Sequence, residues 1–232
     1  MTGLLNWTPP RWPDADVLEG RYARLELLDA DRHGAELHAA NRQSDAIWDF
    51  LPYGPFAEAS DYVAWARGAC AGRDPRFHAI CDLDTGRWGG VASYLRIKPE
   101  AGSIEVGHIN LSPGLQKTRA ATEAMFLLMR WAFEAGYRRY EWKCDARNLG
   151  SRRAAQRLGL SYEGVFRQAT VVKGRNRDTA WFAAIDGEWP ALRAAFEAWL
   201  EPSNFDDAGR QKVSLAALTA PVLVAQDPAL EG

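Results

Sequence analysis

Apolar and polar residues alternate over several short stretches of the chain, as they do in half-buried β-strands. The first stretch is residues 21–28, RYARLELL, and the later ones are residues 77–81, 88–97, 104–111, 139–145, 161–172 and 177–185. The turns DLDTGR and KGRN join two pairs of these stretches, as turns do between the strands of a hairpin. The pattern therefore predicts a sheet of at least seven strands.

Apolar residues recur with a helical period between these strands. We expect helices over residues 29–42, 58–71, 118–135, 149–158 and 187–200. The helix at 118–135 is apolar on nearly every side, which favours burial against a sheet, and Gly136 is placed to end it. Residues 44–56 are rich in aromatic residues and proline and should form a structured loop. Strands interleaved with helices predict a mixed α/β sheet.

The chain divides into three parts by composition. Residues 1–13 contain three prolines and little periodicity, so we expect an N-terminal arm. Residues 14–202 carry all the predicted strands and helices and should form one domain. Residues 203–232 form a C-terminal tail, whose segment VSLAALTAPVLVA is apolar enough to pack against folded protein.

Composition excludes several classes of protein. The chain is 47% hydrophobic and 25% charged, as soluble globular proteins are. A net charge of −2 without a basic tract disfavours nucleic-acid binding, and no apolar run reaches the roughly 20 residues of a membrane span. Three cysteines lack zinc or disulfide spacing. We expect a cytoplasmic protein without a metal and without a signal peptide.

One loop has the character of an anion site. The strand SIEVGHINLSP runs into the loop GLQKTRAATEA, which opens the long predicted helix. The first N–H groups of a helix lack intrahelical partners, and together with the helix dipole they favour an anionic ligand such as a phosphate. A second strand, YRRYEWKCDA, then leads through RNLGS into another helix, with Asn148 at the N-cap position.

These segments resemble the GNAT superfamily of N-acetyltransferases over about residues 14–202. In that family a pyrophosphate loop follows the pattern Q/R-x-x-G-x-G/A, and a later N-x-x-S segment flanks the thioester of acetyl-CoA. Asn148 and Ser151 match that segment. Where the family loop has glycines, we place Thr118 and Ala120. The Thr118 hydroxyl should then cap the helix or face a phosphate.

The resemblance implies a GNAT acyl-CoA fold, with a mostly antiparallel central sheet, splayed strands and flanking helices. It implies acetyl-CoA as the acyl donor, with no metal. The residues expected to contact it are Ile109, Asn110, Leu111, Gln116, Lys117, Thr118, Arg119, Ala120, Ala121, Asn148 and Ser151. Asn148 has a second interpretation as an ordinary helix cap, and Ser151 is the expected proton donor to the thiolate.

Glu105 is the candidate general base. It lies in IEVGHI, which resembles the E-x-G-x segment of the ribosomal-protein-alanine acetyltransferase branch. Alternation predicts that Glu105, Gly107 and Ile109 share one face of the strand, with His108 on the other. His108 is the rival base because its usual pKa lies near neutrality, although that opposite face favours a packed core histidine.

The acceptor is expected to be a primary amine, either a protein N-terminus or a small metabolite, that attacks acetyl-CoA directly. In the family the first helix pair and the last hairpin roof the acceptor pocket. Here these elements supply the candidate contacts Trp48, Phe50, Tyr53 and Arg167. The alternative is a non-catalytic acyl-CoA-binding or interaction protein. The sequence leaves the acceptor, the acyl length and the choice between monomer and homodimer open.

Overall fold

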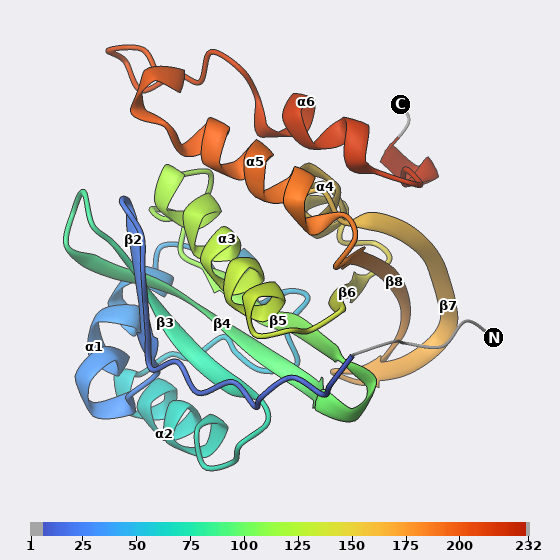
Figure 1. The fold of residues 1–232 in the computed structure, drawn as a ribbon. Helices are drawn as coiled ribbons and strands as arrows, with labels where there is room; N and C mark the ends of the chain where they lie inside the picture. The colour runs from blue at the N-terminus through green and yellow to red at the C-terminus, as the bar shows by residue number, and fades with distance from the viewer. Residues whose placement is uncertain (1–6, 231–232) are drawn as a thin grey trace.

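The computed structural model describes residues 7–230 and contains one sheet of eight strands in the order β1-β2-β3-β4-β5-β6-β8-β7 (Figure 1). Every neighbouring pair is antiparallel except β5 with β6. The predicted mixed, mostly antiparallel sheet is confirmed. The strands are β1 Val17–Glu19, β2 Ala23–Leu27, β3 Arg76–Asp82, β4 Arg87–Lys98, β5 Ser103–Leu111, β6 Arg139–Asp145, β7 Ser161–Val172 and β8 Arg175–Ile185.

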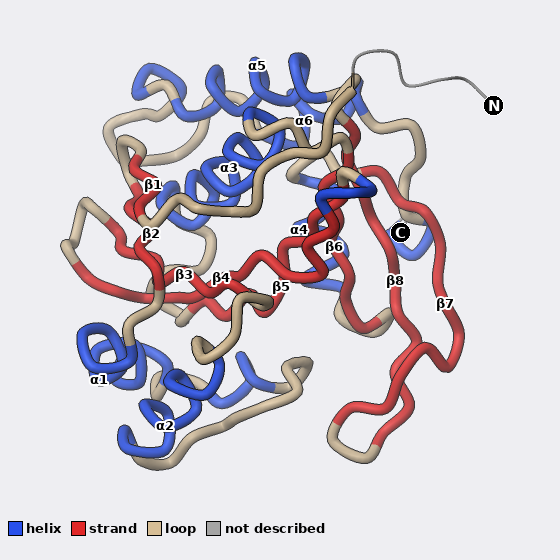
Figure 2. The backbone as a smooth tube through the Cα atoms, turned by 60° about the horizontal axis from the view of Figure 1, so that its bottom comes forward, coloured by secondary structure: helices blue, strands red, loops and turns tan. Residues whose placement is uncertain are grey.

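Helices cover both faces of the sheet. Helices α1 and α2 lie on one face, and α3 lies on the other with α5 packed over it (Figures 1 and 2). The bounds are α1 Ala30–Asn41, α2 Ala59–Ala69, α3 Arg119–Glu134, α4 Leu149–Arg157, α5 Trp189–Leu200 and α6 Leu215–Thr219. The sequence pattern predicted every one of these strands and helices except β1 and the short α6.

Helix α3 is apolar on all sides because it lies between two layers. Its residues Ala124, Leu127 and Leu128 are at most 1% exposed. On the side away from the sheet, Phe126 stacks on Phe196 of α5 with ring centroids 5.0 Å apart. A second, smaller core under α1 and α2 holds Trp48 and its aromatic neighbours.

A buried carboxylate fixes α3 to the start of β2. Glu123 accepts hydrogen bonds from the backbone N–H groups of Arg21, Tyr22 and Ala23, at 2.9, 2.5 and 2.7 Å. Gly20 is required beside it, because a Cβ there would lie 2.3 Å from the Glu123 carboxyl carbon. Three N–H donors compensate the burial of the charge without a cation.

The segment after α5 packs back onto α4 and β7. Asp227 is fully buried and binds Arg152 of α4 through two oxygens, at 2.6 and 2.5 Å. Arg152 also donates to the carbonyl oxygen of Ala146, at 2.7 Å. This segment therefore braces the turn that leads into α4. Residues 1–6 of the expected arm and residues 231–232 of the expected tail lie outside the described part of the chain.

We expect Asp227→Asn to lower the free energy of unfolding by about 3–5 kcal/mol, because it leaves the buried Arg152 guanidinium without its counter-charge. Glu197→Gln is the control, since it breaks the exposed i,i+4 pair of Arg193 with Glu197 and should cost at most about 0.5 kcal/mol. Urea denaturation measures both. Equal losses in the two variants would contradict the role of the Asp227 pair.

Candidate functional site

A cavity opens where β5 and β6 separate. The two strands pair in parallel only from Ser103 with Arg139 to Val106 with Trp142. Beyond Val106, β5 bulges against β4, and the cavity follows the widening gap. Its volume of about 1780 Å³ exceeds the roughly 300–1,000 Å³ of a typical small-ligand pocket, so it has room for two substrates.

One end of the cavity is formed by the loop after β5 and the start of α3. Thr118 is the N-cap of α3, since its hydroxyl oxygen accepts from the N–H of Ala121 at 3.0 Å and donates to the Leu115 carbonyl oxygen at 2.8 Å. Within the described residues, the N–H groups of Arg119 and Ala120 have no acceptor. Free N–H groups at a helix start favour an anionic ligand, so the predicted anion site stays a prediction with this geometry behind it.

The glycine positions of the family pattern were assigned one residue too early. When the pattern Q/R-x-x-G-x-G/A starts at Gln116, its glycine positions are Arg119 and Ala121 and not Thr118 and Ala120. Thr118 is thus an ordinary helix cap, and the real departure is Arg119. The Arg119 side chain turns away from the loop, bonding Asp84 at 3.1 Å and lying over the Tyr22 ring.

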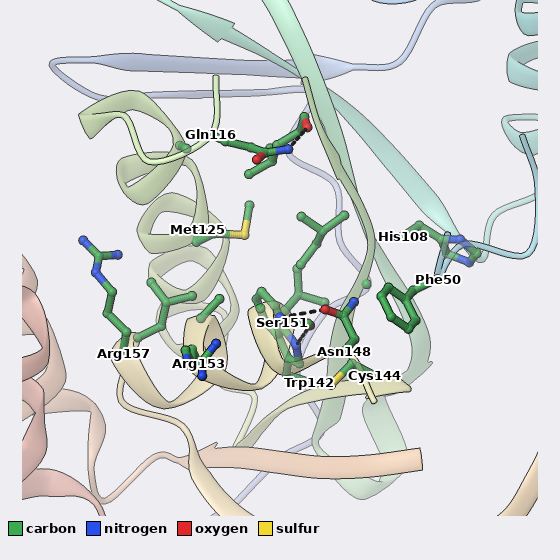
Figure 3. Close-up of a pocket in the computed structure, with 18 of the residues that line it drawn as sticks. Phe50, His108, Gln116, Met125, Trp142, Cys144, Asn148, Ser151, Arg153 and Arg157 are labelled. Carbon is green, nitrogen blue, oxygen red and sulfur yellow. Dashed lines mark hydrogen bonds between the residues drawn. The ribbon is translucent and has the colours of Figure 1, made fainter. Parts of the chain in front are cut away.

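Two other residues of the loop differ in what they offer an anion. Lys117 is exposed and has a left-handed backbone, with φ +62°, and its ammonium has no carboxylate within 4 Å in the described part of the chain. Gln116 instead folds back, and its side-chain amide donates to the Leu111 carbonyl oxygen at 2.9 Å (Figure 3). Lys117 therefore offers a ligand a positive charge, whereas the Gln116 amide is engaged with the backbone.

The middle of the cavity is bordered by the start of α4 (Figure 3). Asn148 caps this helix by accepting from the Ser151 N–H at 3.0 Å, so both interpretations of Asn148 stay open. The indole N–H of Trp142 donates to the Ser151 hydroxyl oxygen at 2.9 Å. A hydroxyl that accepts this bond keeps its own hydrogen to donate, which a departing thiolate requires.

Cys144 lies beside Ser151 on the same wall. Burial raises the pKa of its thiol. A thiol kept protonated is a poor nucleophile.

Glu105 is buried at the point where the two strands separate, with 3% of its surface exposed. One oxygen pairs with Arg96 at 2.7 Å and the other with Lys143 at 2.8 Å. Lys143 also pairs with Glu141 at 2.7 Å and lies 3.8 Å from the Trp181 ring centroid. The candidate base thus lines the cavity inside an ion-pair network that connects β4, β5 and β6.

The bulge changes the facing that alternation predicted. His108 adopts a left-handed φ of +50°, and its ring joins Tyr53 and Phe77 on the α1–α2 side. Ile109 packs instead toward the larger core around α3. The prediction that Glu105 and Ile109 share a face is wrong, because the extra residue shifts the period at His108.

His108 is largely buried but lines the cavity. Its Nδ1 lies 3.2 Å from the Tyr53 hydroxyl. Burial, followed by the charges of Arg96 and Arg177, lowers its pKa to about 4. His108 is therefore neutral near pH 7, a hydrogen-bonding group in the wall rather than a cation.

The acceptor end of the cavity has different residues from those we expected. Phe50 lines it, and Tyr53 supports it through His108. Trp48 is buried beneath and Arg167 points elsewhere, so neither lines the cavity. Asn110 also faces away, although its neighbours Ile109 and Leu111 line the wall. The residues that sequence reasoning missed are Arg96, Lys143, Phe166, Arg177 and Trp181.

Two further features concern metals and membranes. Within residues 7–230 no group of three or more histidine, cysteine or acidic side chains is arranged to hold a metal ion. Over the same residues no helix has the length and apolar character needed to cross a membrane.

Comparisons with known proteins agree with this geometry. Residues 24–161 match the acetyltransferase (GNAT) domain family. A GCN5-related N-acetyltransferase from Brucella melitensis is 47% identical, with 94% of this chain and 100% of that chain covered and a TM-score of 0.91. A GNAT-family acetyltransferase structure from Chromobacterium violaceum is 43% identical, with 82% and 96% covered and a TM-score of 0.78.

A more distant structure shares the fold alone. The microcin C7 self-immunity acetyltransferase MccE, in complex with acetyl-CoA and AMP, is 20% identical, with 72% of this chain and 93% of that chain covered and a TM-score of 0.63. Among proteins with curated descriptions, no relative matches the chain.

We expect Thr118→Ala to destabilise the fold by about 1 kcal/mol, because it removes the N-cap of α3. Thr118→Ser keeps the hydroxyl and is the matched control, with little loss. Urea denaturation of the three proteins measures the difference. If alanine and serine variants were equally stable, the hydroxyl would not cap the helix.

Proposed function

This chain belongs to the GNAT acetyltransferases, and we propose that it transfers the acetyl group of acetyl-CoA to a primary amine by direct attack. The separation of β5 and β6 carries the proposal. It leaves the edge of β5 that faces β6 without a strand partner beyond Val106. This edge lies in the cavity, whose lining includes the start of α3 and Glu105. Backbone groups on such an edge bind an extended ligand by main-chain hydrogen bonds.

Acetyl-CoA binds along this edge in the proposal. The N–H groups of Arg119 and Ala120 and the ammonium of Lys117 receive the pyrophosphate. Ile109 and Leu111 line the path of the pantetheine, and a backbone N–H of β5 polarises the thioester carbonyl. Asn148 and Ser151 then lie beside the sulfur.

The reaction conserves its proton. The amine nitrogen attacks the thioester carbon, a C–N bond forms, and the C–S bond breaks. Glu105 accepts the proton that nitrogen loses, through a water, because the carboxylate is buried. Ser151 donates its proton to the CoA thiolate, and the proton held by Glu105 returns through solvent to the Ser151 oxygen. A thiol with an ordinary pKa of about 8.5 needs only modest help of this kind.

The charges around Glu105 favour an amine that loses its proton easily. Arg96 and Lys143 pair with Glu105, and Arg177 lines the same end of the cavity. Nearby cations disfavour an ammonium ion. An α-amine, with a pKa of about 8, becomes neutral more readily than a lysine, with a pKa of about 10.4. We therefore favour an α-amine as the acceptor.

Acetyl-CoA mixed with the protein and a panel of amines should release free thiol and give N-acetyl products by mass spectrometry. Cys144→Ala should keep most of the turnover, and intact mass should detect no acetylated protein before the amine is added. Binding of acetyl-CoA without turnover for any amine would support the non-catalytic alternative. An acetyl group on Cys144 would refute direct attack.

Glu105→Gln should lower kcat by about 10²-fold or more if Glu105 accepts the proton. The deficit should shrink at high pH, where more of the amine is already neutral. Because the same change breaks two ion pairs, acetyl-CoA affinity and the melting temperature must be measured alongside to establish that the variant is folded. His108→Gln is the rival test. A folded but inactive His108→Gln beside a fully active Glu105→Gln would assign the base to His108.

A further inference from the structure

Arg177 of β8 is a cation in the cavity wall whose guanidinium has no hydrogen bond or ion pair within residues 7–230. Its Nε atom is buried and makes no hydrogen bond, and no carboxylate of the described residues comes within 4 Å of its guanidinium. An arginine carries five donors in a planar fork that matches a carboxylate. A buried donor without an acceptor costs free energy, which a bound anion would recover.

The nearest acidic groups are already engaged. Asp145 accepts from the Arg147 side chain at 2.8 and 3.1 Å. Asp178 accepts from the backbone N–H of Gln168 at 2.7 Å and from the Asn176 amide at 2.9 Å. Neither carboxylate pairs with Arg177 within 4 Å, although Arg177 is, after Arg147, among the charges that lower the pKa of Asp145. Arg177 therefore has no close counter-charge among the described residues.

The strand register places Arg177 beyond the end of β6. The last pair between β6 and β8 is Asp145 with Thr179, so Arg177 lies two residues past it, where β6 has turned toward α4. Residues 177, 179 and 181 all line the cavity, as the alternation of one strand face requires. Arg177 and Arg96 both contribute to the lowered pKa of His108, after burial, so both guanidinium groups lie near the β5 bulge.

The wall next to this cation is apolar. Phe166 and Trp181 stand on the β7–β8 hairpin with ring centroids 4.6 Å apart, and Phe50 borders the same end of the cavity beside His108 (Figure 3). A ligand there meets a guanidinium and aromatic surface within reach of Glu105. That combination suits a compound with a carboxylate, an amine and an apolar side chain.

We infer that the acceptor is a free amino acid with an apolar side chain, whose carboxylate binds the guanidinium of Arg177 while its amine faces the thioester. The inference rests on the proposed function. It goes beyond it by assigning Arg177 as the residue that selects acceptors with a carboxylate. A protein N-terminus has an amide at that position and would leave Arg177 unpaired.

The test compares L-phenylalanine with phenethylamine, in which a hydrogen replaces the carboxylate. The wild-type enzyme should show kcat/KM about 10²-fold higher for phenylalanine, as expected for a charge-assisted bidentate contact. Arg177→Ala should abolish that preference, mainly by raising KM for phenylalanine. Arg177→Lys should restore part of it. Arg175→Ala, an exposed arginine on the same strand, is the matched control and should behave as wild type.

A binding measurement makes the outcome independent of turnover. The acid 3-phenylpropionate carries the ring and carboxylate without the amine. By isothermal titration calorimetry it should bind the wild-type protein, and bind Arg177→Ala at least tenfold more weakly. Unchanged affinity in that variant would overturn the inference. So would equal use of phenylalanine and phenethylamine by the wild type, although N-acetyl transfer would then stand. Failure of every amine to release thiol would instead refute the proposed function.

Discussion

The site depends on one constraint, the early end of hydrogen bonding between β5 and β6. Two parallel strands in the middle of a sheet ordinarily satisfy each other's peptide groups along their whole length. Here four residue pairs do so, from Ser103–Arg139 to Val106–Trp142. Peptide groups beyond that point need other partners, because buried backbone donors and acceptors are rarely left unpaired. The open edge thus offers backbone donors and acceptors to a ligand, before any side chain is considered.

Polar contacts lie on both strands at the point where they separate. Glu105 on β5 and Lys143 on β6 form an ion pair at the fork, and the bulge at His108 bends β5 away just beyond it. On the other strand, the Arg152–Asp227 pair braces the turn that takes the chain from β6 into α4. The same carboxylate that we propose as base is therefore also part of the scaffold. Replacing Glu105 therefore removes a candidate proton acceptor and also breaks ion pairs of the scaffold. Turnover and stability have to be measured separately to distinguish the two effects.

The sequence was sufficient for all the strands and helices except β1 and α6, because alternation and helical period are local signals. The sequence was insufficient where the hydrogen-bonding pattern between strands is interrupted. His108 and Lys117 have left-handed backbone conformations. Glycine would have indicated such a conformation in the sequence, whereas histidine and lysine do not. Alternation assigned His108 to the wrong face for this reason. The sequence analysis did not select Arg177. An arginine becomes a candidate ligand contact when its guanidinium has no acidic partner, and only the packed structure shows which neighbouring carboxylates are bound to other groups.

The cations at the acceptor end give the site a consistent electrostatic character. Glu105 and Asp145 are the acidic groups in this part of the described wall, and both are bound by cations. Arg177 adds a charge without such a partner. A field of this sign opposes an ammonium ion and attracts a carboxylate. An amino acid fits this field, because its carboxylate is attracted by the cations and offsets the positive charge near its own amine. The nitrogen can then approach the thioester. The cations that disfavour a simple ammonium ion are thus the ones that would select an acceptor with a carboxylate.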